Sequence, residues 1–197
     1  VRMFNSIMDH YMEKVRSKRM DVRDKLAKGE RLYIAGLREM MPNKKFYPNA
    51  NSTMRLTYGQ VGDYTPGDAM HYDYVTTFDG LMAKKDNSDD EFMVPERLEE
   101  LYNAKDYGRY ADKDGNLIIN FISGNDITGG NSGSPVLNAY GDLIGTAFDG
   151  NWEAMSGDIA FEPELQRTIS VDIRYVLWCI DKLAGAKHIV DEMTLAR

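Results

Sequence analysis

The sequence predicts a mainly β fold with flanking helices, preceded by the end of an α-helical domain. Residues 1–41 are rich in Lys, Arg, Glu and Met and space their apolar residues as a helix does. From Ser52 onward, apolar and polar residues alternate, which is typical of strands. We therefore expect the C-terminal part of an α-helical domain over residues 1–45 and a β-rich domain over residues 46–197.

The N-terminal segment is predicted to contain two helices. Gly29 is the expected break between them, and Pro42 ends the second because proline cannot continue a helix. The chain opens inside an amphipathic pattern, with neither a capping residue nor an initiator methionine ahead of it. We therefore expect the chain to be a fragment of a longer protein. The apolar residues of this first pattern are Phe4, Ile7, Met8, Tyr11 and Val15.

Strand patterns occupy much of the remaining chain. Residues 54–58 and 71–77 alternate between apolar and polar side chains, and residues 117–122 form the apolar run of a buried strand. Two further strands are expected at residues 135–137 and 143–148. A Tyr-Gly-Asp sequence joins these two, which predicts a turn between them.

Two helices and a turn complete the expected elements. Pro95 begins a short helix over residues 96–104, because proline is favoured at the start of a helix. Asp112–Asn116 superficially resembles a calcium loop, but its glycine falls two places early and no bidentate Glu follows, so we predict a hairpin turn. A closing helix ends near Gly185 and has one apolar face. That face consists of Ile173, Val176, Leu177 and Ile180.

Composition limits the classes of function. Hydrophobic residues make up 43% of the chain, enough for a packed core, and the net charge of −7 argues against binding to nucleic acid or to an anionic membrane surface. No apolar run approaches the length of a membrane span. The single cysteine, Cys179, is predicted to be a small buried residue rather than a nucleophile. No His/Cys/Asp cluster has metal-ligand spacing, so we expect neither a metal nor a cofactor.

The segment Gly129–Val136 is the most informative part of the sequence. It reads Gly-Gly-Asn-Ser-Gly-Ser-Pro-Val, and its first serine, Ser132, is surrounded by glycines that leave the backbone amides bare. The N–H groups of Gly130 and Ser132 can donate to one developing oxyanion, as acyl transfer by a serine nucleophile requires. We therefore predict Ser132 as the nucleophile and these two amides as the oxyanion hole. The alternative is a plain glycine-rich turn.

The surroundings of Ser132 distinguish between the folds of serine hydrolases. The nucleophile elbow of α/β-hydrolases needs a strand, a turn and a helix around the serine. Here Pro135 instead begins a strand that turns into a second strand. This arrangement fits the second β-barrel of a chymotrypsin-like double-barrel serine protease, which we expect over residues 46–197 together with the closing helix.

Three segments together resemble the S46 peptidases, which are bacterial dipeptidyl-peptidases of the 7 and 11 types. The segments are residues 128–138, 148–153 and 170–178, and the resemblance runs from about Leu32 to the C-terminus. It implies an enzyme that removes dipeptides from the N-termini of peptides. It also implies an extracytoplasmic location, periplasmic or secreted, and a homodimer for the full-length enzyme.

The resemblance assigns roles to residues at the end of the predicted strand. Asp149 is implied to bind the free α-amine of the substrate, which would make the enzyme an exopeptidase; the competing interpretation is an Asp-Gly turn. The next position sets the specificity pocket in this family, and Arg there resembles the enzymes that cleave after Asp or Glu. This chain has Gly150, so we predict an open, uncharged pocket that takes an apolar or aromatic residue. Phe148 and Trp152 are expected near it.

Activation of the serine needs a base that a third group orients. The histidines are His10, His71 and His188, and none lies in a setting that resembles the catalytic-histidine motif of the family. The resemblance places the catalytic His and Asp on a first β-barrel that is missing from this chain. We therefore expect the chain to be inactive alone and the three histidines to be surface or packing residues.

Two positions near the nucleophile correspond to functional positions of trypsin-like enzymes, and two other functions are alternatives to a dipeptidyl-peptidase. Asn131 stands where trypsin-like enzymes carry an aspartate that pairs with a newly cut N-terminal amine, so activation by such a cut is not expected. Asp126, six residues before Ser132, stands where trypsin has its specificity aspartate; we prefer a hydrogen-bonding role in the loop. The alternative functions are a trypsin-like or glutamyl endopeptidase and a non-catalytic peptide-binding module.

Overall fold

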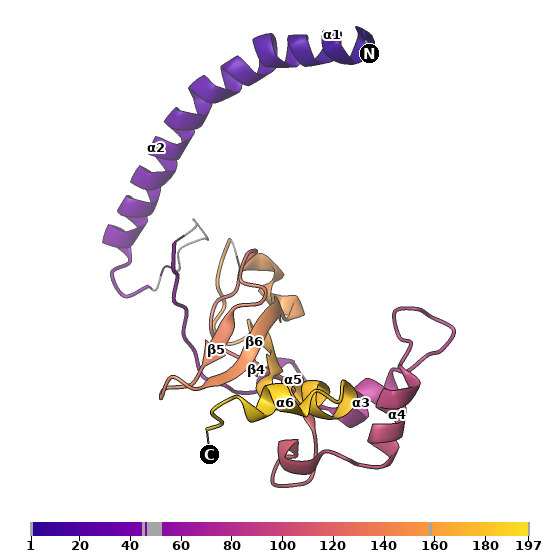
Figure 1. The fold of residues 1–197 in the computed structure, drawn as a ribbon. Helices are drawn as coiled ribbons and strands as arrows, with labels where there is room; N and C mark the ends of the chain where they lie inside the picture. Colours follow the sequence, from indigo (N-terminus) through magenta and orange to yellow (C-terminus); the bar gives the residue numbers. More distant parts are fainter. Residues whose placement is uncertain (1, 45, 47–52, 158, 197) are drawn as a thin grey trace. The chain divides into compact units, whose positions relative to one another are not determined.

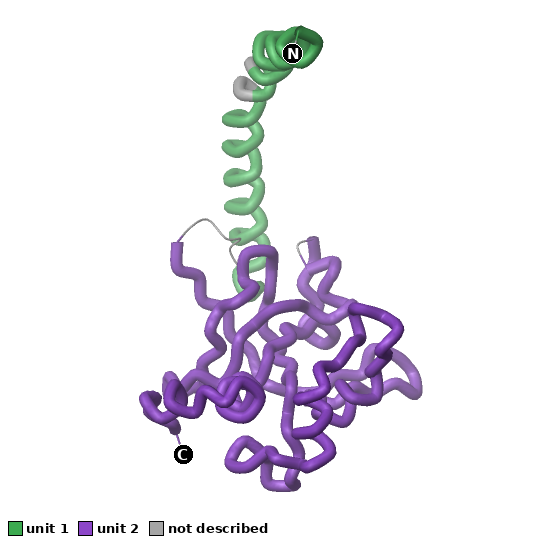
Figure 2. The backbone as a smooth tube through the Cα atoms, turned by 45° about the vertical axis from the view of Figure 1, so that its right-hand side comes forward, with its two compact units in different colours: residues 1–47 green, residues 48–197 purple. Residues whose placement is uncertain are grey.

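The structure is a computed structural model that describes the chain in four stretches: residues 2–44, 46, 53–157 and 159–196. The chain divides into two compact units, residues 1–47 and residues 48–197 (Figure 2). Among the helices of the described stretches, none combines the length and the apolar character that a membrane crossing needs.

The first unit is a continuous run of helix. α1 (Arg2–His10) passes into a π-helical turn, η1 (Tyr11–Arg16), and then into α2 (Ser17–Met40) (Figure 1). The helix ends just before the proline, as predicted, with the Met41 N–H bonded to the Leu37 carbonyl at 2.9 Å.

The predicted break at Gly29 is wrong, because Gly29 lies inside α2. A glycine in a helix interior costs about 1 kcal/mol relative to alanine, which weakens a helix without ending it. Its neighbours Ala27, Lys28 and Glu30 are strong helix formers that keep the segment helical.

The second unit is built on a five-stranded antiparallel sheet. The strand order is β3-β4-β7-β6-β5, and a separate hairpin of β1 and β2 precedes it in the chain. The strands are β1 (Tyr64–Gly67), β2 (Met70–Tyr72), β3 (Val75–Thr77), β4 (Ile118–Ser123), β5 (Pro135–Leu137), β6 (Leu143–Gly150) and β7 (Thr168–Asp172).

The fold mixes helix and sheet, rather than being mainly β as predicted. The antiparallel sheet and its flanking helices agree with the prediction. Among the described strands, β3 and β5 form two separate edges of the sheet, so their pairing does not close it into the expected barrel. The rest of the described part of the second unit consists of the β1–β2 hairpin, helices and long connections.

The predicted strand over residues 54–58 is not formed. This segment is irregular, and the side chains of Met54 and Leu56 are 99% and 81% exposed. Its alternation still has a structural cause, because the intervening Arg55 and Thr57 contact a loop instead of a neighbouring strand. The other predicted alternating stretch, residues 71–77, is divided between β2 and β3.

Apart from η3 (Trp152–Ser156), which lies against β6, the helices of the second unit gather at one end of the sheet (Figure 1). Phe78 and Trp178 meet at the centre of their core with ring centroids 5.2 Å apart, and both side chains are almost fully buried. The Trp178 indole also donates to the Asp106 carbonyl at 2.9 Å. The helical elements of the second unit are α3 (Phe78–Ala83), α4 (Glu96–Asn103), η2 (Gly108–Tyr110), η3 (Trp152–Ser156), α5 (Ile173–Trp178), η4 (Cys179–Leu183) and α6 (Lys187–Asp191).

Both predicted helices of this region are confirmed. α4 follows Pro95, and α5 continues as η4 up to a left-handed Gly185 with φ of 66°. The predicted turn at residues 112–116 is confirmed too. The Asp112 carboxylate accepts the N–H groups of Asp114 and Asn116 at 2.9 and 2.8 Å, which holds the turn from within.

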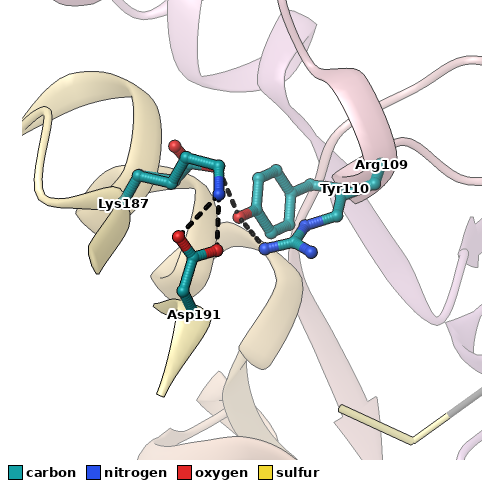
Figure 3. A network of polar contacts seen from close by, with 5 residues as sticks. Arg109, Tyr110, Lys187 and Asp191 are labelled. Carbon is teal, nitrogen blue, oxygen red and sulfur yellow. Dashed lines mark hydrogen bonds and ion pairs between the residues drawn. The ribbon is translucent and has the colours of Figure 1, made fainter. Parts of the chain in front are cut away.

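A polar network lies where η2 meets the C-terminal helix α6 (Figure 3). Within α6, Lys187 donates to Asp191 one turn later at 2.7 Å, a pairing that supports a short helix. The Tyr110 hydroxyl accepts from Arg109 at 3.3 Å and donates to Asp181 at 2.7 Å. These contacts join η2 to the closing helices, at the end of the fold that carries the aromatic core.

Candidate active site

The loop that carries Ser132 connects β4 to β5 and is fastened to β6. The Gly133 N–H donates to the Ala147 carbonyl at 2.8 Å, and the Ala147 N–H donates to the Ser134 carbonyl at 3.0 Å. Gly133 has a φ of 84° and Gly130 a φ of 98°, which is left-handed backbone that glycine adopts without strain. The two glycines therefore allow the chain to turn tightly on both sides of the serine.

Ser132 is exposed beside a pocket of about 260 Å³. Its Oγ donates to the Phe148 carbonyl at 3.2 Å. Within the described part of the chain, neither the Gly130 N–H nor the Ser132 N–H has a hydrogen-bond acceptor. The loop thus presents a hydroxyl at the mouth of a pocket next to two backbone donors that are left for another molecule.

A β-bulge at Phe148 shapes the other side of the pocket. Ala147 pairs with Ser170 and Asp149 pairs with Ile169, so Phe148 is an extra residue on β6. Such a residue bends its strand and redirects the adjoining side chains. As a result the Phe148 carbonyl faces the Ser132 hydroxyl, and its half-exposed ring lines the pocket.

Asp149 and Gly150 follow the bulge and also line the pocket. The exposed Asp149 carboxylate accepts the N–H of Gly150 at 2.8 Å. A Cβ on Gly150 would lie 2.9 Å from the Ala154 Cβ and 3.3 Å from Ile127 Cγ2. The predicted open space beside Gly150 is therefore filled by η3, and glycine is needed there so that η3 can approach β6.

Sequence reasoning missed Asn151, which fixes the base of the pocket. This residue is 8% exposed, and its amide donates to the Leu165 carbonyl and the Glu153 carboxylate at 2.7 and 2.8 Å. Its Oδ1 accepts the Arg167 N–H at 2.8 Å. The Tyr64 hydroxyl joins the same Glu153 at 3.1 Å, and burial raises the pKa of that tyrosine, so it stays protonated as a donor at neutral pH.

The walls of the pocket combine apolar side chains with polar ones and two glycines. Among the described residues that line it, Asp149 is the only one with an ionisable side chain, and none carries a positive charge. Trp152, which was expected nearby, is 82% exposed and lies outside the lining. The apolar part of the lining consists of Ile127, Phe148, Ala154 and Met155.

The histidines lie outside the pocket lining. His10 belongs to α1, His71 on β2 is an exposed neighbour of Asp63 at 3.6 Å, and His188 belongs to α6. No described group of three or more His, Cys, Asp or Glu residues could hold a metal ion. Cys179 is half-buried, and burial raises the pKa of its thiol, so the thiol is protonated at neutral pH and a poor nucleophile.

Asp126 is 6% exposed and does not line the pocket. Its carbonyl accepts the Thr57 hydroxyl at 3.0 Å. A specificity aspartate must face the bound side chain of the substrate, so this placement does not support the trypsin-like alternative.

Comparison with known proteins identifies the family. The family described as Peptidase S46 matches residues 1–195. The chain belongs to the peptidase S46 family. This S46 chain is 58% identical to dipeptidyl-peptidase 7 of Phocaeicola vulgatus over 163 residues, which cover 83% of the chain and 23% of that protein. It is 46% identical to the Asp/Glu-specific dipeptidyl-peptidase of Porphyromonas gingivalis over 191 residues, which cover 97% of the chain and 26% of that protein.

The fold of the S46 chain matches solved structures as well. The crystal structure of Porphyromonas endodontalis DPP11 in complex with substrate aligns with a TM-score of 0.86 and 41% identity. That alignment covers 97% of this chain and 28% of the DPP11 chain. The S46 chain therefore spans about a quarter of the length of the relatives that it matches.

Proposed function

We propose that this S46 chain is the nucleophile-bearing part of a longer serine dipeptidyl-peptidase that forms an acyl-enzyme on Ser132. The observation that carries the proposal is the exposed Ser132 hydroxyl beside two backbone N–H groups that lack acceptors. In the reaction, Oγ attacks the scissile carbonyl, and the Gly130 and Ser132 amides donate to the oxyanion that forms. The dipeptidyl-peptidase names of the relatives support the choice of reaction.

The proposed base and its orienting carboxylate come from the part of the polypeptide outside this chain. Ser132 donates to a backbone carbonyl in the described structure, and a carbonyl cannot take its proton. In serine proteases, loss of the triad costs about 10⁶ in kcat. The chain alone should therefore be inactive, while the whole peptidase acts on peptides.

We further propose that peptides bind along the end of β6. β5 pairs with this strand only as far as Thr146, and the Ser132 loop bonds to Ala147. Beyond that point, no described strand covers this side of β6, so an extended peptide can lie there as an added strand. The exposed Asp149 carboxylate would then pair with the α-amine of the peptide, so that only the peptide bond after the second residue is cleaved.

An apolar or aromatic residue at the cleaved position fits the proposed pocket best. Its walls include four apolar side chains, and the described lining supplies no cation for an acidic side chain. The names of some relatives indicate a preference for Asp or Glu in those proteins, so acidic specificity is the second candidate. A buried carboxylate needs a positive partner, and the described lining does not contain one.

Labelling with a fluorophosphonate tests the nucleophile. In a full-length peptidase that contains this chain, we expect a covalent adduct on Ser132, located by mass spectrometry of the digested protein. Ser132→Ala should abolish the adduct and lower kcat by about 10⁶. Ser88→Ala, which changes an exposed serine on a distant loop, is the matched control and should label normally. An unlabelled wild type would favour the non-catalytic peptide-binding module.

Blocking the amine of the substrate tests the exopeptidase proposal. The wild type should cleave a peptide with a free N-terminus and leave its N-acetylated counterpart intact. Asp149→Asn should lower kcat/KM for the free peptide by about 10–100-fold, because a neutral amide acceptor replaces the carboxylate that pairs with the α-ammonium group. Equal cleavage of both peptides, measured by chromatography of the products, would instead support an endopeptidase.

The Gly150 position tests the preference at the cleaved residue. Gly150→Arg adds the missing cation, but its Cβ would overlap that of Ala154, so we expect Gly150→Arg with Ala154→Gly to fit better than the single change. The double variant should raise the ratio of kcat/KM for Glu over Phe substrates by about 10–100-fold. Gly150→Gln with Ala154→Gly is the uncharged control. A wild type that already prefers Glu would contradict the proposed preference for an apolar residue.

A further inference from the structure

A strap of residues 55–62 runs antiparallel to the chain that leads from β4 to the nucleophile. The Gly62 N–H donates to the Ile122 carbonyl at 3.3 Å, and the Gly124 N–H donates to the Gln60 carbonyl at 2.9 Å. Between these two bonds, Val61 forms a bridge with Ser123. The strap therefore extends along the edge of β4 and beyond its end.

The strap stays in close contact past the end of β4. A Cβ on Gly59 would lie 2.3 Å from the Asn125 backbone nitrogen and 2.4 Å from the Gly124 carbonyl carbon, so only glycine fits at this point. Two residues earlier, the Thr57 hydroxyl donates to the Asp126 carbonyl at 3.0 Å. The register between the two segments is thus kept up to the loop.

Arg55 is the end of the strap and reaches the nucleophile loop itself. Its Nη1 donates to Thr128 Oγ1 at 3.1 Å, and its Nη2 donates to Asn131 Oδ1. Arg55 is half-buried, whereas its neighbours Met54 and Leu56 face solvent. The guanidinium thus joins the first part of the loop to the residue directly before Ser132.

Asn131 is well placed to transmit this contact. It lies between Gly130 and Ser132, whose amides form the proposed oxyanion hole. Its N–H donates to the Thr128 carbonyl at 3.1 Å and its carbonyl accepts the Ser134 N–H at 2.9 Å. The peptide unit that follows Asn131 carries the Ser132 N–H, whereas the Gly130 N–H belongs to the unit between Gly129 and Gly130. Because Arg55 contacts both Thr128 and Asn131, it holds the loop before Gly130 and directly before Ser132. The Thr128 hydroxyl also donates to Asn131 Oδ1, at 3.4 Å.

We infer that Arg55 is a positioning residue that holds the oxyanion hole in place through Asn131. The inference rests on the proposed function, because it assumes that these amides stabilise an oxyanion. Arg55 belongs to the same folded unit as the loop, so the oxyanion hole forms when the chain folds and needs no proteolytic cleavage. A positioning residue of this kind acts on the transition state and has little effect on substrate binding.

Steady-state kinetics of a full-length peptidase containing this chain test the inference. Arg55→Ala should lower kcat for a dipeptidyl substrate by about 10–100-fold, toward the loss seen when an oxyanion donor is removed, while KM changes less than about threefold. Added guanidinium ion should restore part of the kcat of Arg55→Ala, and Arg55→Lys should retain part of it. Arg97→Ala, on the surface of α4, is the matched control and should behave as the wild type.

Asn131→Leu extends the test to the acceptor. This variant keeps Arg55 but removes Oδ1, so it should show a similar loss of kcat, and the double variant with Arg55→Ala should lose no more than either single variant. An unchanged kcat in Asn131→Leu overturns the inference even where Arg55→Ala fails to fold. If the wild type is active and Arg55→Ala is equally active, the positioning role of Arg55 is overturned and the proposed function stands. A wild type without dipeptidyl-peptidase activity overturns the proposed function together with it.

Discussion

Backbone hydrogen bonds between the Ser132 loop and β6 hold the nucleophile next to the residues proposed to bind substrate. Ala147 both accepts from Gly133 and donates to Ser134, so the loop is joined to the strand at the residue before the bulge. The same strand then supplies Phe148 and Asp149. The nucleophile and the residues proposed to bind substrate are therefore parts of one hydrogen-bonded unit.

The pocket takes its shape from two departures from regular strand geometry. The bulge at Phe148 turns a carbonyl toward Ser132 and a ring toward the pocket. Next to it, Gly150 lets η3 pack directly on β6, and the buried Asn151 fixes the turn that brings η3 there. A larger residue at position 150 therefore changes both the specificity of the pocket and the packing of η3 on β6.

The sequence predicts those parts of the site whose residues are neighbours in the chain. Gly130 and Ser132 belong to one glycine-rich run, so local chemistry indicated them. Asp149 and Gly150 were indicated by the resemblance to the S46 peptidases, because local chemistry alone favours an Asp-Gly turn there. The hydrogen bonds of Asn151 to Arg167 and of Arg55 to Asn131 span 16 and 76 residues, and no local sequence pattern predicts contacts over such separations. The alternation at residues 54–58 predicted a strand, because alternating side chains show that a segment has one buried and one exposed face. The pattern does not show whether the buried face packs against a strand or against a loop.

The Ser132 loop is proposed to present one hydroxyl and two amides to the same reacting carbonyl. A crystal structure of the full-length peptidase bearing a dipeptidyl phosphonate adduct tests this arrangement. We expect phosphorus bonded to Ser132 Oγ, and a phosphonate oxygen within about 3.1 Å of the Gly130 and Ser132 nitrogens. Phosphorus on another residue, or an oxygen directed away from both amides, would contradict it.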